Sequence, residues 1–170
     1  MSNNQLIALV DKDDRIIGYK DKTEVHKLGL LHRAFSVFIF NDKGEMLIHR
    51  RAKDKYHSPN LWTNACCSHL LQNMSMDESL HDRLQFEMGF DTKVDYKFKF
   101  TYHNSFDNGL IEHETDYVYF GIWNDIPEFN HNEVSDYKWI SYEDLKNDLR
   151  ANPENYTYWF TYIMNNFEMI

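Results

Sequence analysis

The sequence predicts an α+β protein built around a largely antiparallel or mixed sheet, and three observations lead to this class. The chain has 170 residues, which is enough for one hydrophobic core but few for two. It contains 12 Phe, 11 Tyr and 4 Trp, residue types that favour strands and a deep apolar interior. Segments with strand-like alternation are interspersed with segments that carry helix start and stop signals. We therefore expect residues 1–170 to form a single compact domain, with residues 1–5 flexible.

The first half of the chain is predicted to be rich in strands. Leu6–Val10 and Arg15–Tyr19 flank a turn-like acidic run, and Ala34–Phe40 is apolar on both faces, as in a central strand. The run Asn41-Asp42-Lys43-Gly44 predicts a turn into Met46–Arg51, its hairpin partner. The intervening polar segment holds Lys22, His26 and His32 and carries no strand or helix prediction.

Ser75 and Glu78 form a capping-box pattern that predicts the start of a helix, and Gly89 is typical of the residue after a helix end. The apolar stripe of this helix consists of residues spaced by four: Met76, Leu80, Leu84 and Met88. Glu87 projects into that stripe, with Arg83 one turn earlier. A carboxylate on a buried face must be paired or bind a metal, so an Arg83–Glu87 ion pair and a metal ligand are both open.

A second hairpin is predicted around Asp107-Asn108-Gly109. Val94–Asn104 leads into it with Tyr102 pointing inward, and Leu110–Trp123 returns with Glu112 and Glu114 in phase with core residues. Like charges this close drive one carboxyl to keep a proton unless a cation lies between them. The alternative is a solvated sheet edge.

The C-terminal part predicts one strand and two helices. The strand is Val134–Ile140, and the first helix is Ser141–Leu149 with Ser141 as its cap. A last helix is predicted from Asn152-Pro153 onward, with Tyr156, Trp159, Phe160, Ile163, Met164 and Phe167 on its apolar face.

Both cysteines lie within three residues of a histidine, in the segment Leu61–Leu70. If this segment is a strand, Cys67 and His69 share one face, while Cys66 and Ser68 share the other. A thiol and an imidazole could then line one pocket; the alternative is two small buried residues beside a structural histidine. Adjacent cysteines do not readily pair with each other and form no CxxC, so we expect reduced thiols.

The formal net charge of −9 argues against nucleic acid or an anionic membrane as the main partner. An anionic small molecule would need local basic residues, and Arg50–Lys55 is the densest group of them, unless it is a solvated loop. No apolar run is long enough to cross a bilayer, and the polar start has no signal-peptide core. We expect a soluble, cytoplasmic protein.

Taken together, these residues resemble the type I isopentenyl-diphosphate isomerases of the Nudix-fold superfamily, from about Leu6 to the final helix. The most specific match is Trp-Thr-Asn-x-x-Cys-Ser-His at Trp62–His69, and the second is Ile111-Glu112-His113-Glu114. The resemblance implies a Nudix-like α/β/α domain with additional C-terminal helices. It also implies four catalytic residues: Cys67, Glu114, Tyr102 and Trp159.

The resemblance further implies two metal positions and a diphosphate site. His26, His32, His69, Glu112 and Glu114 match the ligands of one divalent ion, Mg²⁺, Mn²⁺ or Zn²⁺. Glu87 matches the glutamate that holds Mg²⁺ against the substrate diphosphate. The implied diphosphate-binding residues are Lys22, Arg51, Lys55 and Arg83.

The sequence departs from the family pattern in three ways. Leu70 and Tyr158 stand where the family usually has proline. The helix opens with Asn73-Met74 in place of Gly-Glu and lacks the glutamate cluster of a Nudix hydrolase. This last departure argues against pyrophosphate hydrolysis.

The implied activity, a step of isoprene biosynthesis, interconverts isopentenyl and dimethylallyl diphosphate through a tertiary carbocation. A Nudix hydrolase and a non-catalytic metal- or diphosphate-binding module are the competing readings, and neither needs Cys67, Tyr102 and Trp159 together. The expected partner is a small prenyl diphosphate, with no nucleic acid and no membrane, and the expected assembly is a monomer or weak dimer.

Overall fold

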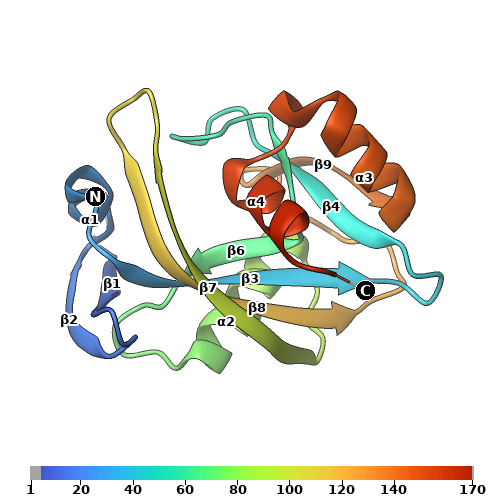
Figure 1. Cartoon of the computed structure of the whole chain (residues 1–170). Coiled ribbons are helices and arrows are strands. Elements are labelled where there is room, and N and C mark those ends of the chain that lie inside the picture. Colours follow the sequence, from blue (N-terminus) through green and yellow to red (C-terminus); the bar gives the residue numbers. More distant parts are fainter. Residues whose placement is uncertain (1–4, 170) are drawn as a thin grey trace. The chain divides into compact units, whose positions relative to one another are not determined.

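The structure is a computed structural model that describes residues 5–169 (Figure 1). The predicted flexibility of residues 1–5 therefore concerns, apart from Gln5, residues outside the described range. Strands and helices alternate along the chain, and the α+β class is confirmed. The described residues divide into two units, taken in turn below: a first unit of residues 5–36, 67–83 and 96–119, and a second unit of residues 37–66, 84–95 and 120–169.

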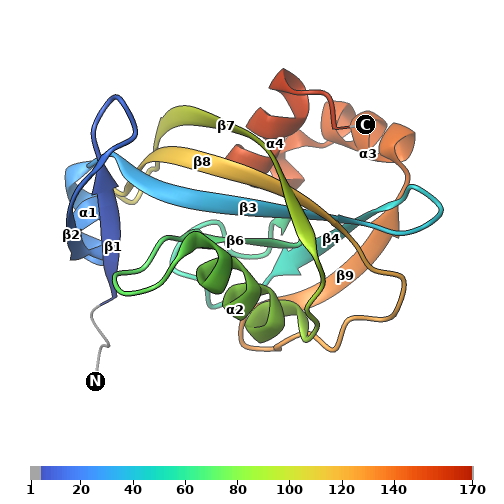
Figure 2. The same ribbon diagram turned by 90° about the horizontal axis from the view of Figure 1, so that it is seen from below.

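In the first unit, β1 (Leu6–Val10) pairs antiparallel with β2 (Ile16–Asp21), as Figure 2 shows. Leu9 of β1 lies opposite His32, the first residue of β3 (His32–Phe40). β6 (Cys66–His69) and β8 (Ile111–Ile122) both pair with β3, and β7 (Val94–Ser105) pairs with β8. These pairings bring residues that are far apart in sequence onto neighbouring strands.

The polar segment before β3 contains a helix that the sequence did not predict, α1 (Lys22–Leu28). Asp21 caps its start, accepting a hydrogen bond from the Glu24 backbone N–H at 3.1 Å. Gly29 ends it in the left-handed conformation, with φ of 68°. The helix buries Val25 and His26. Only two turns fit in this helix, so there is no hydrophobic repeat for a periodicity argument to detect.

The capping box of α2 (Met76–Met88) is confirmed in both directions. The Ser75 N–H donates to Glu78 Oε2 at 2.7 Å, and the Glu78 N–H donates to Ser75 Oγ at 3.1 Å. Gly89 ends the helix with φ of 75°, as expected. Leu80, Leu84 and Met88 are buried.

In the second unit, β4 (Met46–Arg51) is the predicted hairpin partner of β3, with Leu47 opposite Ile39. β4 also pairs with β5 (Trp62–Thr63) and, along its whole length, with β9 (Val134–Ile140). The predicted strand β9 is confirmed residue for residue. α3 (Tyr142–Ala151) follows it, capped as expected by Ser141, whose Oγ accepts from the Asp144 N–H at 3.1 Å.

The segment Leu61–Leu70, considered above as a single strand, forms two short strands, β5 and β6, which are separated at Asn64-Ala65. The Asn64 side chain is fully buried and holds the break by donating from Nδ2 to the carbonyls of Val37, at 3.0 Å, and Cys66, at 2.9 Å. A buried amide that binds backbone carbonyls in this way takes the place of ladder hydrogen bonds. The alternation predicted for Cys67 and His69 applies within β6.

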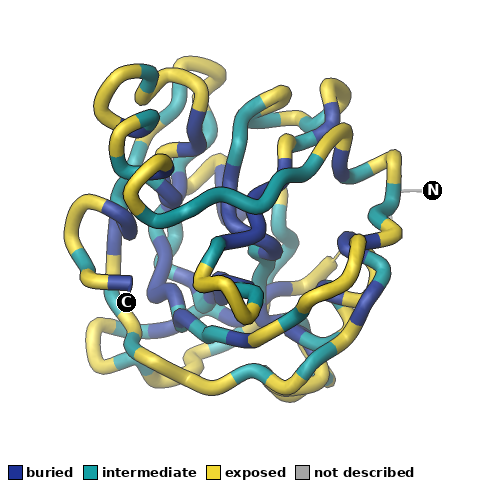
Figure 3. Tube along the Cα trace, turned by 90° about the vertical axis from the view of Figure 1, so that its right-hand side faces the viewer, coloured by how far each residue is buried: buried dark blue, intermediate teal, exposed yellow. Residues whose placement is uncertain are grey.

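The last helix starts later than predicted. Pro153–Asn155 form a single 3₁₀ turn, Tyr156 is extended, and α4 covers Tyr158–Asn166 with Thr157 as its N-cap. The interruption arises because Tyr156 forms a parallel bridge with Trp62, and the Thr157 N–H donates to the Trp62 carbonyl at 3.0 Å. The expected apolar face is buried at Trp159, Phe160, Ile163 and Met164. The last described residue, Met169, is also buried (Figure 3). No helix among the described residues is long and apolar enough to cross a membrane.

Candidate active site

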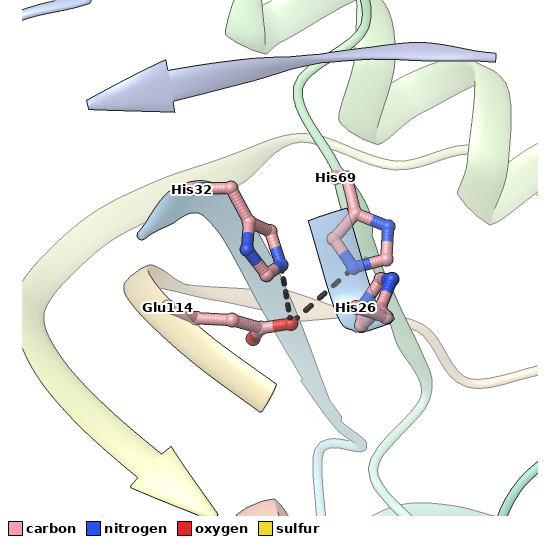
Figure 4. Close-up of side chains that lie close together, drawn as sticks. All are labelled: His26, His32, His69 and Glu114. Carbon is pink, nitrogen blue, oxygen red and sulfur yellow. Dashed lines mark hydrogen bonds and ion pairs between the residues drawn. The ribbon is translucent and has the colours of Figure 1, made fainter. Parts of the chain in front are cut away.

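Four potential metal ligands of the first unit converge from four different elements. His26 comes from α1, His32 from β3, His69 from β6 and Glu114 from β8, and their ligand atoms all lie within 4.8 Å of one another. The three imidazole centroids are 5.0 to 5.2 Å apart. Figure 4 shows His32 and His69 directed at the same carboxylate oxygen of Glu114, with His26 beside them.

Backbone carbonyls set the orientation of two of these imidazoles. His26 Nδ1 lies 2.7 Å from the Lys22 carbonyl, and His32 Nδ1 lies 2.9 Å from the Leu30 carbonyl. A carbonyl only accepts, so each Nδ1 carries the hydrogen and each neutral ring presents a bare Nε2. His26 Nε2 is buried and has no hydrogen-bond partner among the described residues. Metal-ligating histidines are oriented by this kind of contact on the second ring nitrogen.

The electrostatics favour the protonation states that bind a metal. Burial lowers the pKa of His69 to about 3, and burial together with His32 lowers the pKa of His26. Burial alone would raise the pKa of Glu114, but its close contacts with His32 and His69 hold the pKa well below the usual range. Metal binding requires neutral imidazoles and ionised carboxylates, and the pKa shifts of His26, His69 and Glu114 all favour those forms.

The size of the cluster also suits a divalent ion. Bonds of about 2.0–2.2 Å place opposite ligands of an octahedral ion roughly 4.2 Å apart, so a separation of up to 4.8 Å closes with a small inward movement. Three imidazoles and a carboxylate are compatible with several first-row metals and with Mg²⁺. The residues therefore fit a divalent metal and do not select one.

Glu112, the expected fifth ligand, is not part of this cluster. It contacts Tyr102, whose hydroxyl lies 2.7 Å from Glu112 Oε2 and 3.0 Å from Glu114 Oε2. Tyr102 points inward as expected, with 5% of its surface exposed. Burial raises the pKa of the Tyr102 phenol well above its usual value, and the negative charges of Glu112, Glu114 and Asp116 add to this shift. The phenol is thus a neutral hydrogen-bond donor between two carboxylates.

Cys67 and Cys66 lie in different environments. Cys67 is half-buried, and its Sγ lies 3.5 Å from Ser36 Oγ on β3. Ser36 in turn donates to Asp116 Oδ2 on β8 at 2.8 Å. Cys66 is fully buried. Burial and the charge of Glu114 raise the pKa of Asp116 well above its usual value.

In the second unit, Arg51 lies over the indole face of Trp159. The guanidinium carbon is 5.2 Å from the ring centroid, a cation–π distance. Arg51 is also held by the carbonyls of Ser58 and His57, each at 3.2 Å. Trp159 is 4% exposed, and the His57 ring meets its edge at 5.8 Å. One face of the Trp159 indole therefore already contacts a cation, the Arg51 guanidinium.

His49, a buried residue of β4, connects the other predicted residues of the second unit. Burial lowers its pKa to about 4; the Glu87 carboxylate opposes this shift, and the charges of Arg51 and Lys55 add to it. Glu87 is buried as predicted, with 6% exposed. The Lys55 ammonium forms an ion pair with Glu133. The charges of Glu87, Arg51 and Lys55 thus all act on the His49 imidazole.

The two remaining predicted residues belong to the first unit. Lys22 is the first residue of α1, and its charge lowers the pKa of both His26 and His69. Arg83 is half-buried on α2. Three residues of these groups were missed by sequence reasoning: Ser36, His49 and Asp116. Asp116 continues the alternation of Glu112 and Glu114, and that period could have identified it. A serine or histidine within an apolar strand carries no comparable signal.

Comparison with known proteins agrees with this fold. A model of the NUDIX domain matches residues 30–160. Among solved structures, a Deinococcus radiodurans protein superposes with a TM-score of 0.78, covering 94% of this chain and 97% of that chain at 18% identity. A MutT protein from Methanosarcina mazei gives 0.65, covering 79% and 91% at 17% identity. The fold and the histidine–glutamate cluster define a Nudix-domain protein with a candidate metal centre.

Sequence relatives narrow this class. The chain is 43% identical over 162 residues to an isopentenyl-diphosphate Delta-isomerase of Photorhabdus laumondii, covering 95% of this chain and 92% of the relative. A Serratia proteamaculans isopentenyl-diphosphate Delta-isomerase is 42% identical, with 95% and 90% covered. The chain therefore belongs to the isopentenyl-diphosphate Delta-isomerase family of Nudix-domain proteins.

Proposed function

We propose that this protein is a cytoplasmic, metal-dependent enzyme that interconverts isopentenyl diphosphate and dimethylallyl diphosphate in isoprene biosynthesis. The observation that carries the proposal is the convergence of His26, His32, His69 and Glu114, with Tyr102 bound to that same glutamate. Family membership supports the same reaction.

The reaction moves a double bond by adding a proton at one carbon and removing one from another. In the forward direction, which starts from protonated Glu114 and the Cys67 thiolate, Glu114, assisted by Tyr102, delivers a proton to the terminal alkene carbon and leaves a tertiary carbocation. Cys67 removes a proton from the neighbouring methylene carbon, and its C–H electron pair forms the new double bond. The reverse reaction starts from the Glu114 carboxylate and the Cys67 thiol: the thiol returns its proton to that carbon, and the carboxylate removes a proton from a methyl group. No oxidant or reductant is consumed, because one proton enters and one leaves.

Trp159 supplies the indole face that stabilises the carbocation, an interaction of about 2 kcal/mol when desolvated. His26, His32, His69 and Glu114 would hold a divalent ion, Mg²⁺, Mn²⁺ or Zn²⁺, which would supply positive charge beside the Glu114 carboxyl group. Glu112 extends this site through Tyr102.

The diphosphate end of the substrate is bound by basic residues: Lys22, Arg51, Lys55 and Arg83. Glu87 would hold a Mg²⁺ ion that binds the substrate diphosphate. Binding energy gained here, away from the reacting carbons, contributes to catalysis by orienting the alkene. The partner is thus a small prenyl diphosphate, and a monomer or weak dimer is sufficient for this chemistry.

The test is turnover of isopentenyl diphosphate with Mg²⁺ in D₂O. We expect dimethylallyl diphosphate with deuterium incorporated at carbon. Cys67→Ala and Glu114→Gln should each reduce the rate by about 10²–10⁴-fold, since each removes an acid–base group.

Cys66→Ala is the matched control and should retain turnover, because Cys66 is fully buried and successive residues of β6 point to opposite faces. Release of phosphate without isomerisation would instead identify a Nudix hydrolase. Binding without turnover would identify a non-catalytic module.

A further inference from the structure

We propose that Ser36 and Asp116 are positioning residues that fix the thiol of Cys67 through a continuous hydrogen-bond chain. This inference rests on the proposed isomerase function and adds two residues to its machinery. Neither residue was among those implied by the family resemblance. Cys67 lies on β6, Ser36 on β3 and Asp116 on β8, and all three residues belong to the first unit. Ser36 contacts both Cys67 and Asp116.

The hydrogen-bond chain from Cys67 through Ser36 to Asp116 is short, and its Ser36 and Asp116 side chains are buried. Cys67 Sγ lies 3.5 Å from Ser36 Oγ, a normal distance for a sulfur hydrogen bond, and Ser36 Oγ lies 2.8 Å from Asp116 Oδ2. Ser36 is 1% exposed and Asp116 is 2% exposed. A carboxyl group buried to this extent is costly unless it makes hydrogen bonds. An apolar residue of similar volume would fill the same space without that cost.

The direction of the chain follows from its donors. Ser36 has one hydroxyl proton and gives it to Asp116 Oδ2, which accepts whether the carboxyl group is ionised or carries its proton on Oδ1. The Ser36 oxygen then offers only lone pairs to Cys67, so the thiol S–H is the donor of the other bond. Asp116 thereby determines how Ser36 binds the thiol, and Ser36 determines where the sulfur lies.

Fixing the sulfur matters for the proposed reaction. A proton passes efficiently between sulfur and carbon only when the sulfur is held near the line of transfer, and a 1 Å misplacement costs about 100-fold. A cysteine side chain has staggered rotamers that separate its sulfur positions by more than this. The hydrogen bond to Ser36 selects one of them.

The test combines kinetics with a direct probe of the thiol. In Ser36→Ala and Asp116→Val we expect kcat to fall by about 10- to 100-fold, while KM stays within about twofold, since neither residue is assigned to substrate binding. Ser36→Thr keeps the hydroxyl and should restore most of kcat. In a Cys66→Ala background, which leaves Cys67 as the one thiol, the S–H Raman band should shift to higher frequency in Ser36→Ala and return in Ser36→Thr.

Two controls separate a positioning role from general damage. Each variant should bind the same amount of divalent metal as the parent protein, and its far-UV circular dichroism should be unchanged. An unchanged kcat in Ser36→Ala, or an unmoved S–H band, would overturn the inference. If the parent protein does not isomerise isopentenyl diphosphate, the proposed function fails, and the Raman measurement still decides whether Ser36 binds the thiol.

Discussion

His32 Nε2 lies 3.2 Å from Glu114 Oε1, although Nδ1 of the same ring is bound to the Leu30 carbonyl at 2.9 Å. With the hydrogen on Nδ1, the neutral ring directs a lone pair at a carboxylate oxygen, and the two would repel each other. A cation between them reverses the sign of that interaction. His69 Nε2 lies 3.3 Å from the same oxygen, so one ion would satisfy both contacts.

Removal of the metal is therefore expected to destabilise the protein. At an ion concentration 100 times the dissociation constant, binding to the native state contributes about 2.7 kcal/mol. Treatment with a chelator should lower Tm in calorimetry, and adding back one equivalent of a divalent ion should restore it. His32→Ala should lose the bound ion in elemental analysis and should show no chelator effect on Tm.

His131→Ala is the matched control for this experiment, because His131 is exposed in the second unit. It should bind metal like the parent protein. Two results together would contradict a metal at His32 and Glu114. The Tm of the parent protein would not respond to the chelator, and elemental analysis would find no ion in it.

Arg51 leads to a prediction about anion binding. The carbonyls of Ser58 and His57 hold its side chain, so little conformational freedom remains to be lost when it binds an anion. Arg51→Ala should weaken the affinity for inorganic pyrophosphate with Mg²⁺ by about 10- to 100-fold, corresponding to about 1.5–3 kcal/mol for a charged hydrogen bond. Isothermal titration calorimetry measures this directly.

Lys53→Ala removes a neighbouring positive charge that is exposed in the same basic segment. It should leave the pyrophosphate affinity within about twofold. Equal losses in Arg51→Ala and Lys53→Ala would mean that net charge, and not a site at Arg51, governs the binding.

Sequence reasoning was most successful where a local pattern decides the structure. β1, β4 and β9 were predicted with their observed bounds, because each combines strand-forming residues with clear turn signals. The capping box of α2 was predicted because Ser75 and Glu78 are neighbours in sequence. The phase of β8 placed Glu112 and Glu114 inward, and both are buried.

The failures arise where tertiary contacts override local preference. The break at Asn64 depends on the Val37 carbonyl, 27 positions earlier in the chain. The late start of α4 depends on pairing between Tyr156 and Trp62. The roles of Ser36 and Asp116 follow from pairing of β3 with both β6 and β8, and a single strand does not reveal its neighbours.

Two of the departures from the family pattern also have a structural explanation. Asn73 stands where the family has glycine and adopts φ of 67°, a conformation that asparagine tolerates better than most residues. Tyr158 is the first residue of α4, where the backbone N–H has no partner within the helix, so proline and tyrosine are both accommodated. Leu70 differs from these, since its N–H donates to the Arg33 carbonyl at 3.0 Å, a bond that proline would lose.

Asp14 should make stability depend on pH. Burial would raise its pKa, but hydrogen bonds from Tyr117, Lys99 and Arg33 outweigh burial and lower the pKa below 3.8. A carboxyl group with a depressed pKa in the folded state stabilises the protein above its unfolded pKa, and this contribution disappears as the pH falls through the folded value. Asp14→Asn should lower the free energy of unfolding by about 1–2 kcal/mol at pH 7. This value allows for solvent screening of the Lys99 charge, because the Lys99 side chain is 46% exposed.

The measurement is urea unfolding of both proteins between pH 7 and pH 3. The difference in unfolding free energy should be constant down to about pH 4 and should narrow below it. Asparagine tolerates the φ of 60° at this position, so the substitution probes charge and not backbone strain. A difference that instead grows as the pH falls would contradict the depressed pKa.

Gly89 offers a test of how α2 is terminated beside Glu87. A Cβ at this position would lie 2.0 Å from the Glu128 carbonyl oxygen, and the residue has φ of 75°. The left-handed conformation alone costs a non-glycine residue about 1–2 kcal/mol, and backbone must move to relieve the contact. Gly89→Ala should therefore lower the unfolding free energy by about 3 kcal/mol or more.

Gly44 separates the cost of the left-handed conformation from the cost of the Glu128 contact, since its φ is 77° and a Cβ there would meet nothing within 4 Å. Gly44→Ala should cost about 1–2 kcal/mol in the same urea titration. Equal losses in the two variants would show that the Glu128 contact is relieved without cost. The predicted excess in Gly89→Ala measures how firmly residues 128–130 pack against the end of α2, where the Asn130 N–H donates to the Glu87 carbonyl at 2.9 Å.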